Sequence, residues 1–527
     1  MNKIKNYQLS LLSAALLILG WPPLPTAFLL FIALVPLLMI REKLDQDPKK
    51  HRKFWLWSWL TLFLFNTGTT WWVWNASPSG TVMMLVCNSL IMSLPFLAYS
   101  QTKEIYPRLA GLSLIAYYLL FEYWHFNWSA AWPWLTFGKG LASIPSFIQW
   151  YEFTGELGGT LLIILINYIS LRIIVNKQYK KIYIPISVLL LMGVISFSLS
   201  SFIDLSKNVK TLECVISQPN IDPYTEKFGD GDGYLYPEIQ IDYALEPAES
   251  LITPNTDVLL FPETAIVGFN KESELKDNFL FQPLKKLTDT GKLCIIAGSE
   301  SFEVYPDKEK PSITARYDSS INKWFDFFNS GMNIKKGEVR EIYHKSKLVP
   351  GVEKMPFAFL EKLSINLGGT SGSLGVSDKP INFEINTGDK VAPLICYESV
   401  FGDYTNEFVK EGATLLAVMT NDGWWKETPG YKQHLMYGAI RCIETRREMI
   451  RSANTGISAH INQYGKILKQ TKYKERTAFT CRAIPNNEIT FYVKYGNILG
   501  KTSILSLLLI LGTLVRKFIN RKNKVTV

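Results

Sequence analysis

The sequence has few charged residues, and its six cysteines show no paired spacing. Charged side chains make up 19% of the 527 residues, against 47% hydrophobic and 13% aromatic residues, which argues against a purely soluble protein and excludes disordered and collagen-like chains. The mean hydropathy of +0.07 equally argues against a chain that lies wholly within a membrane. Cysteines without a CxxC pair predict neither a zinc site nor a disulfide framework, which leaves them as candidate working thiols. The composition therefore indicates membrane spans joined to a water-exposed part.

Long apolar runs dominate residues 1–203. Seven runs there, and an eighth near the C-terminus, have roughly the 17 to 22 residues that a helix needs to cross about 30 Å of hydrocarbon. We therefore predict an α-helical membrane bundle of eight transmembrane helices, seven in a domain over 1–203 and one in a segment over 496–527 that ends in a basic tail. The expected spans lie near 7–22, 24–40, 54–74, 81–99, 109–126, 157–175, 182–202 and 496–515.

The positions of the basic residues account for the net charge of +10. A basic protein can bind nucleic acid, or it can hold lysine and arginine in loops beside a membrane. With the N-terminus in the cytoplasm, nineteen basic residues fall on the cytoplasmic side of the spans and one, Lys139, falls in the short loops opposite. This asymmetry follows the positive-inside rule and predicts that 204–495 lies outside the cytoplasm. No nucleic-acid partner is expected.

Residues 204–495 alternate short β-prone runs with helical patterns. The alternation predicts an α/β domain with its own core, in which functional residues tend to lie at or just beyond strand ends. The expected strands lie at 211–217, 257–261, 292–297, 338–343, 391–396 and 414–420, and the helical patterns near 272–287, 400–411 and 430–447.

Three reactive side chains follow such strands. Glu263 comes after an apolar run and a proline, Lys345 after a strand that ends in Tyr-His, and Cys396 after Pro-Leu-Ile. Each also has an ordinary explanation, as a carboxylate at a helix start, a solvated lysine and an inert buried thiol. The position of Cys396 between a strand and a helix predicts a lowered thiol pKa, because helix N-terminal amides stabilise a thiolate. The Asn-Asp-Gly run at 421–423 is typical of a turn.

Glutamate, lysine and cysteine in this order, each after a strand, resemble the triad of the nitrilase, or carbon-nitrogen hydrolase, superfamily. The motifs are Pro-Glu-Thr-Ala, Tyr-x-Lys-x-x-Leu-Val-Pro and Cys-Tyr-Glu. With membrane spans before and after them, the chain resembles the apolipoprotein N-acyltransferase family over nearly its whole length. The resemblance implies a nitrilase-like α-β-β-α sandwich over 204–495. It also implies a general base at Glu263, a triad lysine at Lys345 and a nucleophile at Cys396, supported by Glu353, Tyr397 and Glu398.

The same resemblance implies the last step of bacterial lipoprotein maturation. A fatty acyl chain would pass from a membrane phospholipid, such as phosphatidylethanolamine, to a thioester on Cys396. From there it would pass to the N-terminal α-amine of a diacylated apolipoprotein, whose first residue is an S-diacylglyceryl cysteine. No metal or cofactor is implied. The protein would be a multi-pass enzyme of the bacterial inner membrane, with its catalytic domain in the periplasm and with loops near 220–233 and 351–376 that keep water from the thioester.

Two other functions fit parts of the sequence. A membrane-tethered amidase of the same superfamily would use water as the second nucleophile, and analysis of the products separates it from an acyltransferase. A transporter or lipid-binding module would have lost catalysis, although paired discontinuous spans are not evident. Loss of activity in Lys345→Ala with unchanged lipid binding would discard this last reading.

Overall fold

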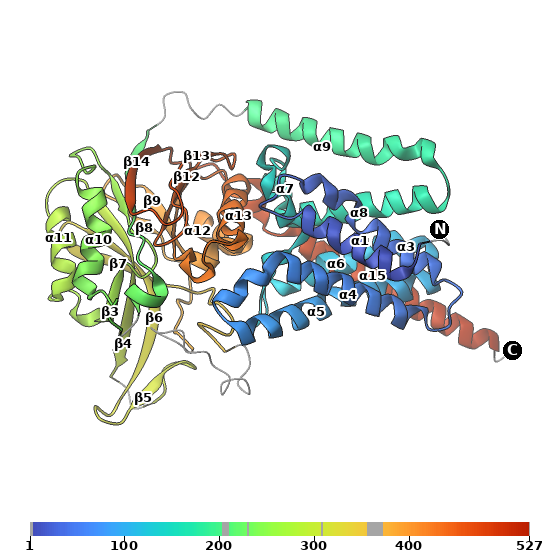
Figure 1. Ribbon diagram of the computed structural model, residues 1–527, viewed down its shortest axis with the longest axis horizontal. Helices are drawn as coiled ribbons and strands as arrows, with labels where there is room; N and C mark the ends of the chain where they lie inside the picture. The colour runs from blue at the N-terminus through green and yellow to red at the C-terminus, as the bar shows by residue number, and fades with distance from the viewer. Residues whose placement is uncertain (1–3, 203–209, 229–230, 307–308, 356–372, 526–527) are drawn as a thin grey trace. The chain divides into compact units, whose positions relative to one another are not determined.

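The chain folds into two compact units, which are described one after the other. One unit is made of Met1–Phe202 with Tyr495–Val527, and the other of Ile203–Lys494. The computed structural model describes residues 4–202, 210–228, 231–306, 309–355 and 373–525 (Figure 1).

The first unit is built from apolar helices, and every expected span coincides with one helix or a pair of helices. Within the part of the chain that the structure describes, four segments are long and apolar enough to cross a membrane, namely Pro78–Ile105, Glu156–Val175, Tyr179–Ser201 and Ile498–Arg516. A membrane bundle is therefore supported, while the count of eight spans stays a prediction. The helices are α1 (Asn6–Leu19), α2 (Leu30–Ala33), α3 (Val35–Lys43), α4 (Lys50–Thr70), α5 (Pro78–Ile105), α6 (Ala110–His125), α7 (Tyr151–Thr154), α8 (Glu156–Val175), α9 (Tyr183–Phe202) and α15 (Ile498–Val525).

The second expected span, near 24–40, is not one continuous helix. The break between α2 and α3 falls just before Pro36, which lacks an N–H and cannot continue the preceding helix. Asn167 of α8 supplies the missing partners, because its Oδ1 accepts hydrogen bonds from the main-chain N–H groups of Leu34 and Val35 at 2.8 and 3.1 Å. Backbone groups inside an apolar bundle need such partners, so this break is built into the bundle.

Two helices of this unit present apolar side chains outward. On α9 the exposed fractions are 65% for Leu190 and 71% for Phe197, and on α15 Leu509 is 72% exposed. Continuous apolar surface of this kind is unfavourable in water and fits the hydrocarbon of a bilayer. The outward faces of α9 and α15 thus support the assignment of this unit to a membrane.

The second unit stacks two β-sheets between two pairs of helices. The first sheet has eight strands in the order β14-β1-β2-β4-β6-β5, with β3 beside β4 and β7 beside β6, and the second has six in the order β13-β12-β11-β10-β9-β8. Helices α10 (Pro237–Glu249) and α11 (Gln282–Thr288) cover the first sheet, while α12 (Gly402–Lys410) and α13 (Pro429–Thr445) pack on the second (Figure 1). The layers follow the order α-β-β-α that the resemblance implies.

Both parallel and antiparallel strand pairs occur in this unit. β1, β2 and β4 run parallel, as do β9, β10 and β11, whereas β14 pairs antiparallel with β1. The bounds are β1 (Leu212–Gln218), β2 (Val258–Leu260), β3 (Ile266–Lys271), β4 (Cys294–Tyr305), β5 (Arg316–Asp318), β6 (Lys323–Lys335), β7 (Glu338–His344), β8 (Phe383–Glu384), β9 (Lys390–Ile395), β10 (Leu415–Thr420), β11 (Met449–Ala453), β12 (Ala459–Ile461), β13 (Ile467–Gln470) and β14 (Thr477–Ala483), and a short helix α14 (Phe491–Tyr495) follows.

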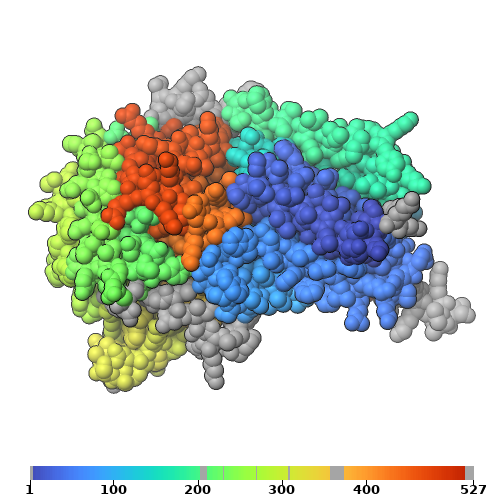
Figure 2. Space-filling view, in the orientation of Figure 1, coloured from blue at the N-terminus to red at the C-terminus, as the bar shows by residue number. Residues whose placement is uncertain are grey.

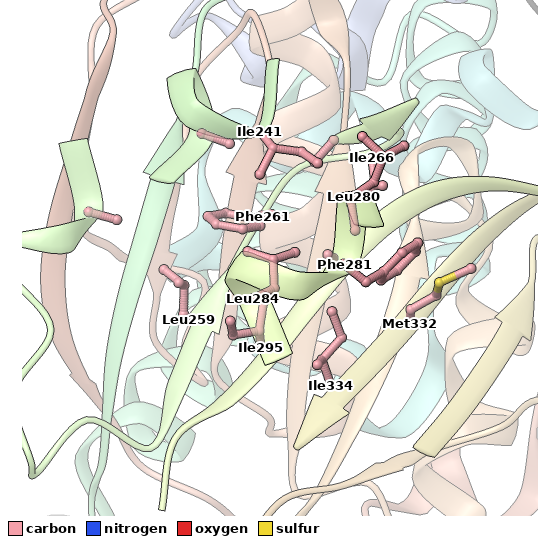
Figure 3. Packing of buried hydrophobic residues seen from close by; sticks show 14 of the residues in the cluster. Ile241, Leu259, Phe261, Ile266, Leu280, Phe281, Leu284, Ile295, Met332 and Ile334 are labelled. Atoms are coloured by element: carbon pink, nitrogen blue, oxygen red, sulfur yellow. The ribbon is translucent and has the colours of Figure 1, made fainter. Parts of the chain in front are cut away.

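A hydrophobic core joins the first sheet to its helices (Figure 3). Ile241 of α10 and Leu284 of α11 pack in one cluster with Leu259 of β2, Ile295 of β4 and Ile334 of β6, and all five side chains are buried. Burying a side chain of this size contributes about 1.5 to 3 kcal/mol. The cluster fixes β2 and β4 against their helices and so anchors the loop that follows β2.

The six strands expected from the sequence are present as β1, β2, β4, β7, β9 and β10. The helical pattern near 272–287 was correct only at its end, because 272–281 contains two short 3-10 turns and α11 begins only at Gln282. Asn278 explains the late start, since its side chain accepts a hydrogen bond from the N–H of Leu280 at 3.0 Å and caps a new turn. β6 was not expected from the sequence.

Candidate active site

Glu263, Lys345 and Cys396 come together, each just beyond the end of a strand. Glu263 lies in the loop after β2, while Lys345 and Cys396 directly follow β7 and β9. The ammonium of Lys345 donates to Oε1 of Glu263 at 3.0 Å, and the charges of both residues act on the Cys396 thiol. All three side chains are buried, with exposed fractions of 5%, 1% and 8% in chain order. The structure therefore brings together the three residues to which the sequence pointed.

Both carboxylate oxygens of Glu263 have protein donors. Oε1 accepts from the side-chain amide of Asn329 at 2.8 Å as well as from Lys345, and Oε2 accepts from the main-chain N–H of Asn421 at 3.1 Å. Gly298 of β4 lets the Glu263 loop pack directly against β4, because a Cβ at this position would lie only 2.6 Å from the Cα of Glu263. Hydrogen bonds to an ionised carboxylate are short and directional, so the carboxylate is fixed in one orientation.

Lys345 lies between two carboxylates. Its ammonium also donates to Oε1 of Glu353 at 2.7 Å, and Oε2 of Glu353 accepts from the main-chain N–H of Val349 at 2.8 Å. Burial alone would lower the pKa of Lys345, but Glu263 and Glu353 outweigh it and raise that pKa well above its usual value. Lys345 is therefore a permanent cation at neutral pH, suited to stabilising negative charge rather than to moving a proton.

Cys396 sits in a strained part of the backbone. Its φ of +49° lies in the left-handed region, which is uncommon for a residue other than glycine and is often found at functional sites. The expectation of a lowered thiol pKa was wrong, because burial, and then the negative charge of Glu263, raise the pKa of Cys396 while Lys345 opposes them. The resting thiol keeps its proton, and reaction at its sulfur requires a base close by.

Glu398 joins the two loops that carry Lys345 and Cys396. Its Oε1 accepts from the main-chain N–H of Ser346 at 2.7 Å and from the hydroxyl of Tyr343 at 2.5 Å, and its Oε2 accepts from the N–H of Ile395 at 2.9 Å. Burial raises the pKa of Glu398 to about 7, although these hydrogen bonds oppose the rise. These hydrogen bonds tie the loop of Lys345 to the turn of Cys396.

Tyr397 is buried beside the nucleophile. Its ring lies edge-on to Phe401, with centroids 5.1 Å apart, and the side chain is 3% exposed. The ring therefore packs against the turn that follows Cys396.

A second group of polar and charged residues, missed by the sequence analysis, lies next to the main chain of Cys396. Nε2 of His434, on α13, is 3.1 Å from the carbonyl oxygen of Cys396, and Nδ1 is 2.9 Å from Asp422. Arg451 of β11 donates to the other oxygen of Asp422 at 2.6 Å. These three side chains hold the main chain of the Cys396 turn. The Asn-Asp-Gly run at 421–423 was the one signal for them, and it indicated no more than a turn.

Lys227 is a further charged side chain near the site. It is 1% exposed, and its ammonium has no hydrogen-bond partner among the residues that the structure describes. Burial lowers the pKa of Lys227 to about 8, although the charges of Glu300 and Glu263 oppose the shift. The segment that carries it packs on the loop after β10, where the ring of Phe228 stacks on Trp424 at 5.8 Å between centroids. Lys227 therefore places an unpaired cation near the carboxylate of Glu263.

Parts of the two expected covering loops, residues 229–230 and 356–372, lie outside the described residues. Within the described ranges, no group of three His, Cys, Asp or Glu side chains is placed to hold a metal ion.

The sequence was compared with models of known families. The model of the carbon-nitrogen hydrolases matches residues 196–488, which is more than half of the chain. The chain belongs to the carbon-nitrogen hydrolase family. A second model, described as the apolipoprotein N-acyltransferase N-terminal domain, matches residues 13–169. These two matches confirm the resemblance that the motifs indicated.

Relatives that match nearly the whole chain bear one name. The apolipoprotein N-acyltransferase of Chlorobaculum tepidum is 28% identical and covers 95% of this chain and 96% of its own length. The apolipoprotein N-acyltransferase of Thermotoga maritima is 25% identical, with 93% and 90% covered, and that of Haemophilus influenzae is 24% identical, with 99% and 97% covered. Among solved structures, an amidase from Nesterenkonia sp. is 15% identical over 56% of this chain and 97% of that chain, with a TM-score of 0.36.

Proposed function

We propose that this protein transfers a fatty acyl chain from a membrane phospholipid to the N-terminal α-amine of a diacylated apolipoprotein, through a thioester on Cys396. The observation that carries the proposal is the buried ammonium of Lys345, which bonds to Glu263 at 3.0 Å and to Glu353 at 2.7 Å beside the thiol. A base, a fixed cation and a nucleophile are what acyl transfer needs. The relatives named for this reaction and the match to the apolipoprotein N-acyltransferase N-terminal domain support the choice of substrates.

The first half-reaction begins with the protonated thiol. Glu263 removes the proton of Cys396 as the sulfur forms a bond to the ester carbonyl carbon of the phospholipid. Lys345 stabilises the oxyanion that develops on the carbonyl oxygen. When the carbonyl reforms, the carbon-oxygen bond of the ester breaks and the lysophospholipid oxygen takes the proton back from Glu263. The acyl chain is then held as a thioester.

The second half-reaction uses the amine of the apolipoprotein. The neutral amine attacks the thioester carbonyl, Glu263 takes a proton from the attacking nitrogen, and Lys345 again stabilises the oxyanion. The carbon-sulfur bond breaks, and the leaving sulfur receives the proton from Glu263. An amide and the original thiol result, which predicts ping-pong kinetics.

The membrane supplies both substrates in this scheme. We propose eight transmembrane helices in the bacterial inner membrane, with residues 204–495 in the periplasm. The proposal is supported by the basic residues that gather on one side of the spans and by the outward apolar faces of α9 and α15. Labelling of single introduced cysteines in intact cells tests it, because reaction of a residue in 204–495 only after the inner membrane is opened would place the domain in the cytoplasm.

The decisive experiment is mass spectrometry of a diacylated lipopeptide incubated with the purified protein and phosphatidylethanolamine. We expect the lipopeptide to gain one acyl chain by an amide bond, and the protein to carry an acyl adduct on Cys396 when the lipopeptide is left out. The matched control is Cys87→Ala, which removes an exposed thiol from the helical unit and is expected to keep full activity.

Three outcomes of the same experiment would contradict the proposal. An acyl adduct that persists in Cys396→Ala would place the nucleophile elsewhere. Release of free fatty acid with no change in the lipopeptide would show that water is the acceptor, as in an amidase. Binding of phospholipid with neither product would favour a lipid-binding module.

A further inference from the structure

Two cysteines outside the active site face each other across the first sheet. Cys214 of β1 is the register partner of Cys481 of β14. Residues directly opposite in an antiparallel pair have Cα atoms about 4.5 to 5.5 Å apart, within the range of about 4.4 to 6.8 Å that a disulfide spans. The two thiols interact with each other in the reduced protein. No backbone movement is therefore needed to join them.

The two cysteine residues differ in exposure. Cys214 is 1% exposed, and its thiol donates to the carbonyl oxygen of Leu212 at 3.6 Å, whereas Cys481 is only partly buried. Cys481 is therefore the member of the pair that lies nearer to solvent.

A histidine and a glutamate from the second sheet complete the cluster. His460 of β12 interacts with the Cys481 thiol, and its Nε2 is 2.8 Å from Oε2 of Glu448, which also accepts from the main-chain N–H of Ile484 at 2.9 Å. A cysteine, an imidazole and a carboxylate that orients the imidazole form the arrangement that activates thiols. The carboxylate keeps the imidazole in place beside the sulfur.

The charges in this cluster favour one thiolate. The interaction with Cys214 and the cation of His460 lower the pKa of Cys481 to about 6 against the effect of burial, and the pKa of Cys214 is raised well above its usual value. Burial would lower the pKa of His460, but Cys481 and Glu448 outweigh it and raise that pKa to about 9. At neutral pH Cys481 is a thiolate beside an imidazolium, and Cys214 keeps its proton.

We propose that Cys481 and Cys214 form a redox-active thiol pair, in which Cys481 attacks an external disulfide and Cys214 resolves the product into a protein disulfide. The Cys481 thiolate forms a bond to one sulfur of the external disulfide, and the other sulfur leaves as a thiolate. That thiolate takes the proton of Cys214, whose sulfur then attacks the sulfur of Cys481 and expels the second external sulfur as a thiolate, which takes a proton from solvent. Two protein thiols are oxidised, and one external disulfide is reduced to two thiols. The proposal goes beyond acyl transfer and does not depend on it.

The first test is disulfide exchange with oxidised glutathione as the probe. The full-length chain is used with Cys396→Ala, so that the active-site thiol does not react. We expect peptide mass spectrometry without reduction to find Cys214 joined to Cys481, and we expect Cys214→Ser to leave glutathione on Cys481 instead. Either Cys481 left unmodified by the probe, or a glutathione adduct on Cys481 that never converts to the protein disulfide, would overturn the proposal.

The second test measures how far His460 activates Cys481. At pH 6 a thiol with a pKa of about 6 is half thiolate, whereas an ordinary thiol with a pKa of about 8.5 has roughly 0.3% thiolate. The more acidic thiolate is also a weaker nucleophile, by a factor of about ten to twenty. The net advantage in reaction rate at pH 6 is therefore up to about tenfold. We expect the alkylation rate of Cys481 by iodoacetamide at pH 6 to fall in His460→Asn by less than this tenfold, because the interaction with Cys214, which the variant keeps, is the larger cause of the lowered pKa. An unchanged rate in His460→Asn, with circular dichroism showing that the sheets persist, would refute activation by His460.

Discussion

Replacing Asn329 by alanine is expected to slow acylation of Cys396 while leaving phospholipid binding unchanged. The side-chain amide of Asn329 donates to Glu263 at 2.8 Å and to Glu353 at 3.2 Å, so it joins the two carboxylates on either side of Lys345. Asn329 does not reach Cys396 through any hydrogen bond of the described residues. Its effect on the reaction is therefore to orient Glu263.

The size of the effect follows from the kind of bond that is lost. A hydrogen bond to a charged group contributes about 1.5 to 3 kcal/mol. Both bonds come from one nitrogen, so we count one such contribution rather than two. At about 1.4 kcal/mol for each factor of ten, the rate of thioester formation is expected to fall by roughly 10-fold to 100-fold.

Asn333 provides a matched control on the same strand. It lies four residues along β6, is equally buried, and donates from its side-chain amide to Glu341 at 2.7 Å and to the carbonyl oxygen of Glu384 at 3.0 Å. Asn333→Ala thus removes the same type of side chain and a similar pair of bonds, but it does so away from the active site. We expect it to lower the melting temperature without slowing the acylation step.

The assay is single-turnover acylation of the protein by phosphatidylethanolamine, followed by intact-protein mass spectrometry at several lipid concentrations. The expected result is a lower maximal rate in Asn329→Ala with an unchanged half-saturating lipid concentration. Equal acylation rates in Asn329→Ala and the parent, or equal slowing in Asn333→Ala, would refute the orienting role.

Further variants test the charges of the candidate site and of the second unit. Lys345→Met is expected to reduce thioester formation by about 100-fold to 1000-fold, the usual cost of a lost oxyanion donor, with lipid binding retained in a flotation assay. Gly298→Ala is expected to slow acylation, because the new Cβ would lie 2.6 Å from the Cα of Glu263, and circular dichroism checks that the sheets persist. Burial lowers the pKa of Lys227 from 10.5 to about 8, so its charge destabilises the fold at neutral pH. Lys227→Met is therefore expected to raise the free energy of unfolding at pH 7 by up to about 3 kcal/mol. Denaturant titrations should show this gain shrinking as pH rises from about 8 to 10.5, where the lysine of the parent loses its charge. His460→Asn is expected to lower the melting temperature at pH 6 but not at pH 10. The pKa of His460 is raised from 6.5 to about 9 in the folded protein, so the protonated imidazole stabilises the fold. This stabilisation is complete below pH 6.5 and is lost as pH rises through 9.

The reactive residues were predictable because each one follows a strand directly in the chain. The β-prone runs that end just before Glu263, Lys345 and Cys396 mark both the strand and its end, although only those before Glu263 and Cys396 are apolar, and parallel strands of one sheet present their ends together. The three side chains come together only because the two sheets pack against each other, since Lys345 follows β7 of the first sheet and Cys396 follows β9 of the second. The family motifs, rather than the local pattern, supplied that part of the prediction.

The residues that orient the site were not predictable from local patterns. Asn329 lies in the middle of β6, and nothing in the neighbouring sequence separates it from Asn333 on the same strand. His434 lies on a helix far along the chain from Cys396, so only the packing of α13 brings it to the carbonyl oxygen at 3.1 Å. The thiol pKa was predicted in the wrong direction because the expectation counted helix amides and left out burial and the charge of Glu263.

The antiparallel pairing of β1 with β14 has a consequence for how such a protein can arise. The first and last strands of the second unit are neighbours, so the polypeptide enters and leaves that unit at adjacent points. A module whose two ends lie side by side can be inserted into a loop of another protein without disturbing either partner. The same property makes residues 210–494 a suitable fragment to express alone. A short linker could join its two ends, and the fragment could be studied in water without detergent.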